Sequence, residues 1–169
     1  LRETGFAVLA NHPISADRIK EIYDNWGGFF ETDAKFDYAV QPPAHDGYFA
    51  FRSENAKDSA VKDLKEFFHV YPNCALPKSL EKMTRQIYAD LEGLGRELLG
   101  WMQAESPREV TDQLSIPFVD MMEDSNQSLL RILHYPPVGD VEPNAIRAAA
   151  HEDINLITLL LSGSKPGLQ

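Results

Sequence analysis

The chain has 169 residues, of which 43% are hydrophobic and 25% charged, and this composition is typical of one globular domain. Lys and Arg number 16 against 26 Asp and Glu, which gives a formal net charge of −10. A nucleic-acid partner is disfavoured, because this surface would repel a phosphate backbone. The longest apolar runs, such as residues 157–161, are far shorter than the roughly 20 residues of a membrane-spanning helix, so we expect no membrane partner.

One cysteine, Cys74, excludes an internal disulfide and a CxxC metal site, and the count fits a reducing, cytoplasmic location. Residues 1–4 lead directly into a strand-like segment and show no signal-peptide pattern. The last residues, 167–169, stop where a further strand is expected to begin. We therefore expect the sequence to be part of a longer domain, and nothing in it predicts the oligomeric state.

The first predicted elements are a buried strand and an amphipathic helix. Residues 5–10 form a short apolar run that Pro13 must end, because proline cannot continue a central strand. Ser15 suits a helix N-cap, and apolar residues follow it at helical spacing. These residues are Ile19, Ile22, Tyr23, Trp26 and Phe30.

Residues 33–63 are rich in loop formers, and the regular elements around and after them alternate in type. The aromatic segments 47–51 and 66–71 are predicted as short strands. A long helix with one buried face follows, because apolar residues recur every three or four positions between 80 and 102. Residues 107–114 predict a shorter helix with proline in its first turn.

The last part of the chain has the character of strands. Residues 129–135 are bounded by two prolines, and residues 154–161 are β-branched and apolar up to Ser162-Gly163. Helices with a few strands thus precede successive strands. This order predicts an α+β domain in which helices back a β-sandwich or barrel.

The tripeptide 151–153 carries the clearest chemical signal. In an extended segment, residues two apart face the same way, so His151 and Asp153 can present a nitrogen and a carboxylate oxygen to one point while Glu152 faces elsewhere. With a distant histidine, they would complete the 2-His-1-carboxylate facial triad of ferrous oxygenases. The aliphatic run that follows would form a dry wall. By spacing alone HxD recurs by chance, and such a histidine is commonly a solvated surface group.

Further segments of the chain add to this signal. Together they resemble the isopenicillin N synthase-like family of iron(II), 2-oxoglutarate-dependent dioxygenases, and they occur in the order of that family over nearly the whole chain. The segments are Gly5-Phe6, Asn11–Ile14, Asp63–Phe67, Leu130–Pro136, His151–Leu160 and Pro166–Gln169.

The resemblance implies a double-stranded β-helix (jelly-roll) core backed by helices, part of which lies beyond this chain. Residues 1–118 would form the N-terminal helical and strand region and residues 119–169 the start of the catalytic core, within one structural unit. Fe(II) would be bound by His151, Asp153 and a second histidine beyond Gln169, and an Arg-x-Ser pair there would hold 2-oxoglutarate. The implied activity is O2-dependent oxidation of a C–H bond of a small organic substrate by hydroxylation, desaturation or cyclisation.

The strand that ends at residue 135 supplies two candidate co-substrate contacts. Tyr135 occupies the place of a family tyrosine that contacts the co-substrate or substrate, and Leu133 stands where many plant members have asparagine. Arg131 shares the face of Tyr135 and is a candidate anion contact, although an Arg on a sheet surface often only extends to solvent. His134 points to the opposite face.

Other conspicuous residues have structural interpretations. We expect His12 to stabilise a turn, His45 to be solvent-exposed and His69 to be either a hydrogen-bonded core residue or a pocket residue. Cys74 is expected to be an inert small side chain. Four phenylalanines are expected in the core: Phe49, Phe51, Phe67 and Phe68.

Two other functions stay open at the level of sequence. One is a jelly-roll protein without turnover that serves as a binding or regulatory module, which a missing second histidine or Arg-x-Ser pair would favour. The other is a zinc or manganese enzyme of the cupin type. Such enzymes usually have more histidines around the metal, so metal analysis and the ligand count would separate them.

Overall fold

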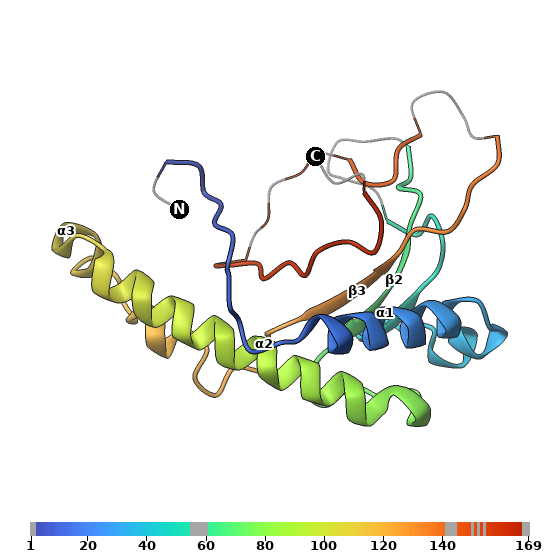
Figure 1. The fold of residues 1–169 in the computed structure, drawn as a ribbon, viewed down its shortest axis with the longest axis horizontal. Coiled ribbons are helices and arrows are strands. Elements are labelled where there is room, and N and C mark those ends of the chain that lie inside the picture. The colour runs from blue at the N-terminus through green and yellow to red at the C-terminus, as the bar shows by residue number, and fades with distance from the viewer. Residues whose placement is uncertain are drawn as a thin grey trace.

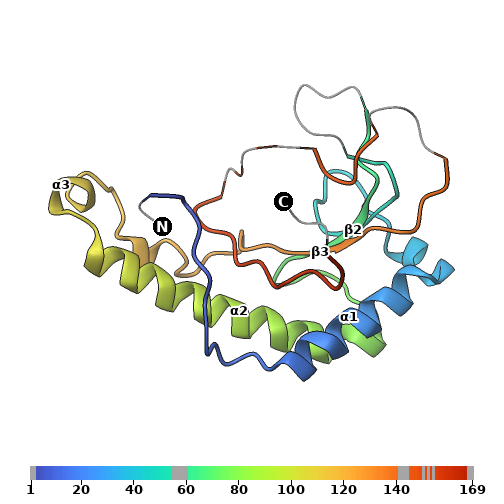
Figure 2. The ribbon, with the colours of Figure 1, turned by 45° about the horizontal axis from the view of Figure 1, so that its top comes forward.

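The computed structural model describes residues 3–54, 61–140, 145–149, 151, 153 and 155–166. In these residues, three α-helices, two short 3-10 helices and a three-stranded antiparallel sheet of order β1-β2-β3 make up an α+β arrangement. Figures 1 and 2 show α1 and α2 on the same side of the sheet, with α3 beyond the far end of α2. The elements are α1 (Ala16–Phe30), η1 (Asp33–Tyr38), β1 (Gly47–Phe49), β2 (Glu66–Val70), α2 (Lys78–Glu105), α3 (Arg108–Thr111), η2 (Phe118–Asp120) and β3 (Leu130–His134).

Helix α1 begins where the sequence predicts it. The Ser15 hydroxyl accepts a hydrogen bond from the Arg18 amide at 3.3 Å, which satisfies one of the free N–H groups of the first turn. The apolar stripe of the helix is buried at Ile22, Trp26 and Phe30, as expected from its spacing. α1 thereby presents one aromatic face to the sheet and to α2.

The core lies between the two long helices and one face of the sheet. Trp26 of α1 packs against Phe68 of β2, with ring centroids 5.1 Å apart. The indole N–H of Trp26 donates to the Thr84 hydroxyl of α2 at 3.1 Å, so the buried polar atoms are paired. Other buried members of this core are Ile14, Ile22, Phe30, Tyr48, Val70, Cys74, Leu76, Leu80 and Ile87.

Strand β2 is buried on both faces, and its side chains alternate between them. Phe68 faces the helices, whereas Phe67 faces away and stacks on Phe49 of β1 at 4.6 Å. In the register of the β2–β3 pair, His69 lies opposite Arg131. We call the surface formed by Phe49, Phe67, His69 and Arg131 the distal face of the sheet.

A buried carboxylate, Glu66, joins the strands to the helical layer. It accepts hydrogen bonds from the Tyr48 hydroxyl, from Lys35 Nζ at 2.9 Å and from His134 Nδ1 at 2.7 Å. Burial by itself would raise the pKa of Glu66, but these hydrogen bonds lower it below its usual value. The carboxylate is therefore ionised and fully partnered.

Two predicted strands are wrong. Residues 5–10 pair with no strand in the described part of the chain, and Phe6 and Val8 are 85% and 98% exposed. Residues 155–161 are likewise outside any strand, although their burial alternates from 157 to 161 as in an extended segment; Ile154 lies outside the described residues. Apolar character predicts an extended backbone, but a strand also needs a partner for its N–H and C=O groups.

The other differences are small, and one concerns the aromatic core. α2 extends further than the apolar periodicity shows, and α3 is shorter than predicted. Phe67 and Phe68 are buried as expected, but Phe51 is 37% exposed because it follows β1 in a turn.

Among the described residues no helix has both the length and the apolarity to cross a membrane.

Candidate functional site

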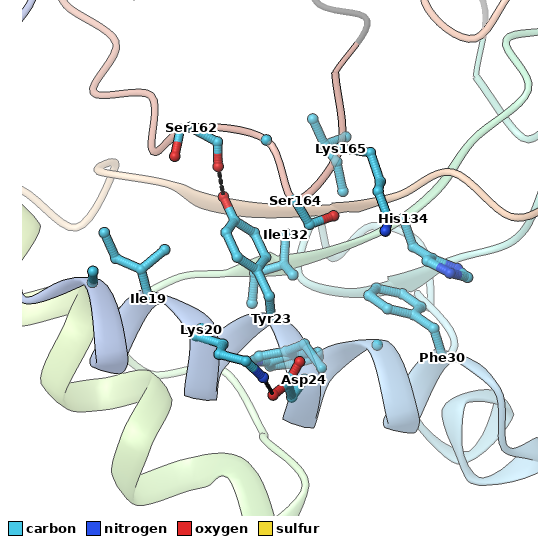
Figure 3. Close-up of a pocket in the computed structure, with 15 residues that line it drawn as sticks. Ile19, Lys20, Tyr23, Asp24, Phe30, Ile132, His134, Ser162, Ser164 and Lys165 are labelled. Carbon is cyan, nitrogen blue, oxygen red and sulfur yellow. Dashed lines mark hydrogen bonds and ion pairs between the residues drawn. The ribbon is translucent and has the colours of Figure 1, made fainter.

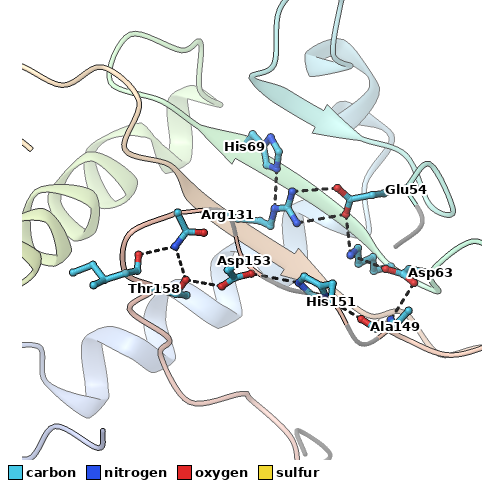
Figure 4. Close-up of polar contacts among 11 residues, drawn as sticks. Glu54, Asp63, His69, Arg131, Ala149, His151, Asp153 and Thr158 are labelled. Carbon is cyan, nitrogen blue, oxygen red and sulfur yellow. Dashed lines mark hydrogen bonds and ion pairs between the residues drawn. The ribbon is translucent and has the colours of Figure 1, made fainter. Parts of the chain in front are cut away.

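The structure brings His151 and Asp153 together. Nε2 of His151 lies 3.5 Å from Oδ1 of Asp153, and both side chains are about half exposed. Figure 4 shows the imidazole and the carboxylate turned toward each other on a segment that lies outside the sheet. Two potential metal-ligand atoms thus lie close together, as the sequence predicts, while Glu152 lies outside the described residues.

The hydrogen bonds of His151 define which ring nitrogen is free. Nδ1 lies 2.8 Å from the carbonyl oxygen of Ala149. A carbonyl only accepts, so in the neutral ring Nδ1 carries the proton and Nε2 keeps its lone pair. Metal-binding histidines usually donate their second N–H to a carbonyl or carboxylate in this way.

Asp153 is oriented by a neighbouring hydroxyl. Oδ2 accepts a hydrogen bond from Thr158 Oγ1 at 2.8 Å, and Thr158 in turn accepts one from Asn155 Nδ2 at 2.8 Å. These contacts fix one carboxylate oxygen and leave Oδ1 directed at His151 (Figure 4). The pair therefore has its supporting hydrogen bonds in place on both sides.

The donor set fits a divalent metal ion such as Fe(II). Adjacent ligand atoms of an octahedral ion lie about 3 Å apart when each metal–ligand bond is about 2.1 Å. The observed 3.5 Å is close to this separation. Among the described residues no third His, Cys, Asp or Glu joins the two, so this part of the chain offers two candidate ligand atoms to such an ion.

The predicted dry wall after Asp153 is not formed by these residues. Leu156 and Leu160 are 47% and 65% exposed, while Leu161 packs on the core. In an extended segment only alternate side chains can face the protein, so half of the aliphatic run points outward.

Arg131 lies on the distal face and is held by two partners. Its Nε donates to Nε2 of His69 at 2.9 Å, and its terminal nitrogens lie 3.2 and 3.4 Å from the two carboxylate oxygens of Glu54. The guanidinium also stacks over Phe67, 4.8 Å from the ring centroid. Three of its five N–H groups are used in these contacts, which leaves donors for a further acceptor.

Tyr135 directly follows β3 and is partly exposed. Burial raises the pKa of its hydroxyl above the usual value, while the nearby positive charges of Lys65 and Arg131 act in the opposite direction. Leu133 is also exposed, whereas His134 points to the helices and stacks on Phe30. The expected division of these neighbours between two faces is confirmed.

His69 is hydrogen-bonded at both ring nitrogens, because Nδ1 also lies 3.0 Å from the His45 carbonyl oxygen. Burial lowers the pKa of His69 to about 4, and Arg131 adds to this effect. His69 is thus a neutral residue with both ring nitrogens hydrogen-bonded, and His45 is solvent-exposed as expected.

Cys74 is buried, and burial raises the pKa of its thiol, which fits an unreactive side chain.

Sequence reasoning missed the residues that connect this site to the sheet. Asp63 and Lys65 are buried, and they bond to each other and to Glu54 and Ala149. The signal was present as charged residues directly before an aromatic strand.

A pocket of about 650 Å³ lies elsewhere, between α1, the end of β3 and residues 162–165 (Figure 3). The Tyr23 hydroxyl donates to the carbonyl oxygen of Ser162 there. Neither His151 nor Asp153 lines this pocket, so it is separate from the candidate metal ligands.

Comparison with known proteins agrees with this chemistry. Residues 1–89 match the family model described as the N-terminal region of the non-haem dioxygenase in morphine synthesis, which is more than half of the chain. The chain belongs to this non-haem dioxygenase family. The resemblance to iron(II), 2-oxoglutarate-dependent dioxygenases is thereby confirmed.

The curated proteins that the chain resembles include a hydroxylase and a protein named as a flavonol synthase. It is 31% identical to the proline hydroxylase buaE of Petromyces alliaceus over all of the chain and 58% of that protein. It is 32% identical to a protein named probable flavonol synthase 5 of Arabidopsis thaliana over 99% of the chain and 52% of that protein. The chain thus spans little more than half the length of the curated relatives it matches.

Solved structures support the dioxygenase fold. A crystal structure assigned as an oxygenase from Shewanella oneidensis has a TM-score of 0.80 and 46% identity, over 92% of the chain and 57% of that protein. A 2OG-Fe(II) oxygenase family protein from Caulobacter crescentus has a TM-score of 0.58 and 27% identity, over 81% of the chain and 49% of that protein.

Proposed function

We propose that this dioxygenase chain supplies His151 and Asp153 as two Fe(II) ligands of a 2-oxoglutarate-dependent oxygenase that oxidises a C–H bond of a small organic substrate. The 3.5 Å approach of His151 Nε2 to Asp153 Oδ1 carries the proposal. The third ligand and the Arg-x-Ser pair would come from outside this chain, within a complete jelly-roll core. When bound, Fe(II) would activate O2, which is the oxidant, and 2-oxoglutarate would supply two of the electrons that reduce it.

The residues of the chain bind and orient in this proposal. The Nδ1–H group of His151 stays on the Ala149 carbonyl, so Nε2 keeps its lone pair for the metal ion. Thr158 holds Oδ2 of Asp153, so the same carboxylate oxygen is presented each time the site is loaded. This order reduces the rearrangement needed on metal binding.

Tyr135 and Arg131 are the proposed co-substrate contacts. Arg131 lies on the distal face, and Tyr135 directly follows β3. The free N–H groups of Arg131 can donate to a carboxylate of 2-oxoglutarate. Glu54 balances the charge of Arg131, so this guanidinium is expected to orient the co-substrate more than to supply its main ionic contact. Conservative changes, Tyr135→Phe and Arg131→Lys, are then expected to raise the KM for 2-oxoglutarate.

The direct test uses the full-length protein with Fe(II), 2-oxoglutarate and a substrate library under air, and measures succinate release. His151→Ala and Asp153→Ala should remove both iron binding and succinate release. His45→Ala and Asp24→Ala are matched controls, because these side chains are exposed and lie outside the candidate site. Iron binding that survives in both site variants would exclude these residues as ligands.

The same experiment separates the two other functions. Metal binding without succinate release from any substrate would favour a binding or regulatory module. A strong preference for Zn(II) or Mn(II), with turnover that is independent of 2-oxoglutarate, would favour an enzyme of the cupin type.

A further inference from the structure

Two hydrogen bonds join the segment that leads to His151 to the residues just before β2. The Leu64 amide donates to the Ile146 carbonyl oxygen at 3.0 Å, and the Ala149 amide donates to Asp63 Oδ1 at 3.2 Å. The carbonyl of the same residue, Ala149, holds Nδ1 of His151. Ala149 thus connects Asp63 on one side with the candidate metal ligand on the other.

We propose that Asp63 is a positioning residue that sets the placement of His151 through Ala149, and so raises the affinity of the site for its metal ion. The inference rests on the proposed function, because it takes His151 and Asp153 as the ligands. His151 and Asp153 are half exposed and outside any strand, so their own backbone does not fix them. Precise placement of exposed ligands requires support from a rigid element.

Asp63 has the surroundings of such a support. Its side chain is only 4% exposed, and its second oxygen, Oδ2, is 2.9 Å from Lys65 Nζ. Lys65 is also buried and pairs with Glu54 at 2.9 Å. Burial alone would lower the pKa of Lys65, but the two carboxylates raise it above its usual value, so the ammonium stays charged.

The contacts continue without a break to the distal face (Figure 4). Glu54 pairs with Arg131, and Arg131 bonds to His69 within the β2–β3 ladder. The two carboxylates of this network balance its two cations. One connected set of polar contacts therefore links the rigid sheet to Ala149, and through it to the candidate ligands.

Two roles of Asp63, stabilising the fold and positioning His151, predict different effects of its substitution. If Asp63 only stabilised the fold, its loss would lower the unfolding temperature and leave the metal affinity of the folded protein unchanged. If it positions His151, the affinity falls even where the protein stays folded. Supporting residues of metal ligands typically change the affinity by about 10- to 100-fold.

The test measures Mn(II) binding to the full-length protein by titration with detection of free Mn(II), together with thermal unfolding. Asp63→Ala is expected to weaken binding at least about tenfold. Thr84→Val is the control, because it removes a buried hydrogen bond between α1 and α2 and should lower stability without changing the affinity. Asp63→Ala with an affinity within about twofold of wild type would overturn the proposal.

A rescue experiment adds a readout that a structural role would not produce. In Asp63→Asn the single amide oxygen is expected to turn to the Lys65 ammonium, which leaves the Ala149 amide without an acceptor and weakens metal binding. Adding Lys65→Met frees that oxygen for Ala149, so the double variant should recover affinity relative to Asp63→Asn. Adding Lys65→Met to Asp63→Ala should give no recovery, and equal behaviour of the two pairs would also overturn the proposal.

The outcomes separate the two proposals. If wild-type protein fails to bind Mn(II) and Fe(II), the metal site itself is wrong and the positioning role falls with it. If wild type binds and His151→Ala does not, but all Asp63 variants bind as wild type, only the positioning role is wrong. Because Asn has nearly the size of Asp, Asp63→Asn decides the matter should Asp63→Ala not fold.

Discussion

The Nε–H group of Arg131 donates to Nε2 of His69 at 2.9 Å, between two residues that face each other in the β2–β3 ladder. Nδ1 of the same ring bonds to the His45 carbonyl oxygen, so both nitrogens of a neutral imidazole are satisfied. A second proton would remove the acceptor of Arg131 and place two cations side by side. Burial and this neighbour together lower the pKa of His69 to about 4.

The stability of the protein should therefore rise with pH over the window from about pH 4 to pH 6.5. In that window His69 is neutral when folded but protonated when unfolded, because its ordinary pKa is 6.5, so the unfolded state binds more protons. Denaturation midpoints measured across this range should show the dependence. His69→Gln should flatten it, whereas His45→Gln, which keeps the backbone carbonyl, should not. An unchanged slope in His69→Gln would show that other groups cause it.

Replacing Glu66 by glutamine is expected to destabilise the fold by about 2 kcal/mol or more, because the partly buried ammonium of Lys35 then lacks its counter-charge. The measurement is the free energy of unfolding in urea. Asp24→Asn is the control, since Asp24 pairs with Lys20 in an exposed helical i,i+4 contact and should matter by less than about 1 kcal/mol. Equal effects of the two changes would contradict the special role of the buried carboxylate.

Thr84→Val should cost about 1–3 kcal/mol, because it leaves the buried indole N–H of Trp26 without an acceptor while keeping the side-chain volume. Thermal unfolding and hydrogen exchange of the indole N–H measure the effect. A variant as stable as wild type, with an equally protected indole, would show that another group takes over the contact.

Thr158→Val is expected to weaken metal binding by about tenfold, because Oδ2 of Asp153 loses its donor and the carboxylate can rotate away from His151. Mn(II) titration of the full-length protein provides the measurement. Thr158→Ser keeps the hydroxyl and should bind as wild type. Weak binding by both variants would point to a loss of packing instead.

Glu54 and Glu66 are a second reason why the folded protein should become less stable at low pH. Hydrogen bonds and nearby cations lower the pKa of both carboxyl groups although burial opposes this. Because their pKa is lower in the folded state, both carboxylates stabilise the fold above the unfolded pKa, near 4.5. This stabilisation is lost as the pH falls through the lower pKa of the folded state. Unfolding in the Glu66→Gln variant should therefore depend less on pH below about 4.5.

The sequence by itself predicted α1, α2, the three strands of the sheet and the approach of His151 to Asp153. Local rules suffice for these features: apolar periodicity for α1 and α2, a serine cap at residue 15, and alternation along an extended backbone for the ligand pair. The family resemblance came from motifs in order along the chain. The division of the chain at residue 118, the metal-ligand roles of His151 and Asp153, and the roles of Tyr135 and Arg131 stay predictions.

Only the tertiary structure decided which segments find a partner. Residues 5–10 and 155–161 have the apolarity of strands but lie outside the sheet, because pairing depends on a neighbouring edge that apolarity does not encode. The contact of Asp63 with Ala149 joins residues 86 positions apart, and no local pattern indicates it. Buried charges are stable only when distant partners meet them, so the polar network around Lys65 became visible in the folded chain alone.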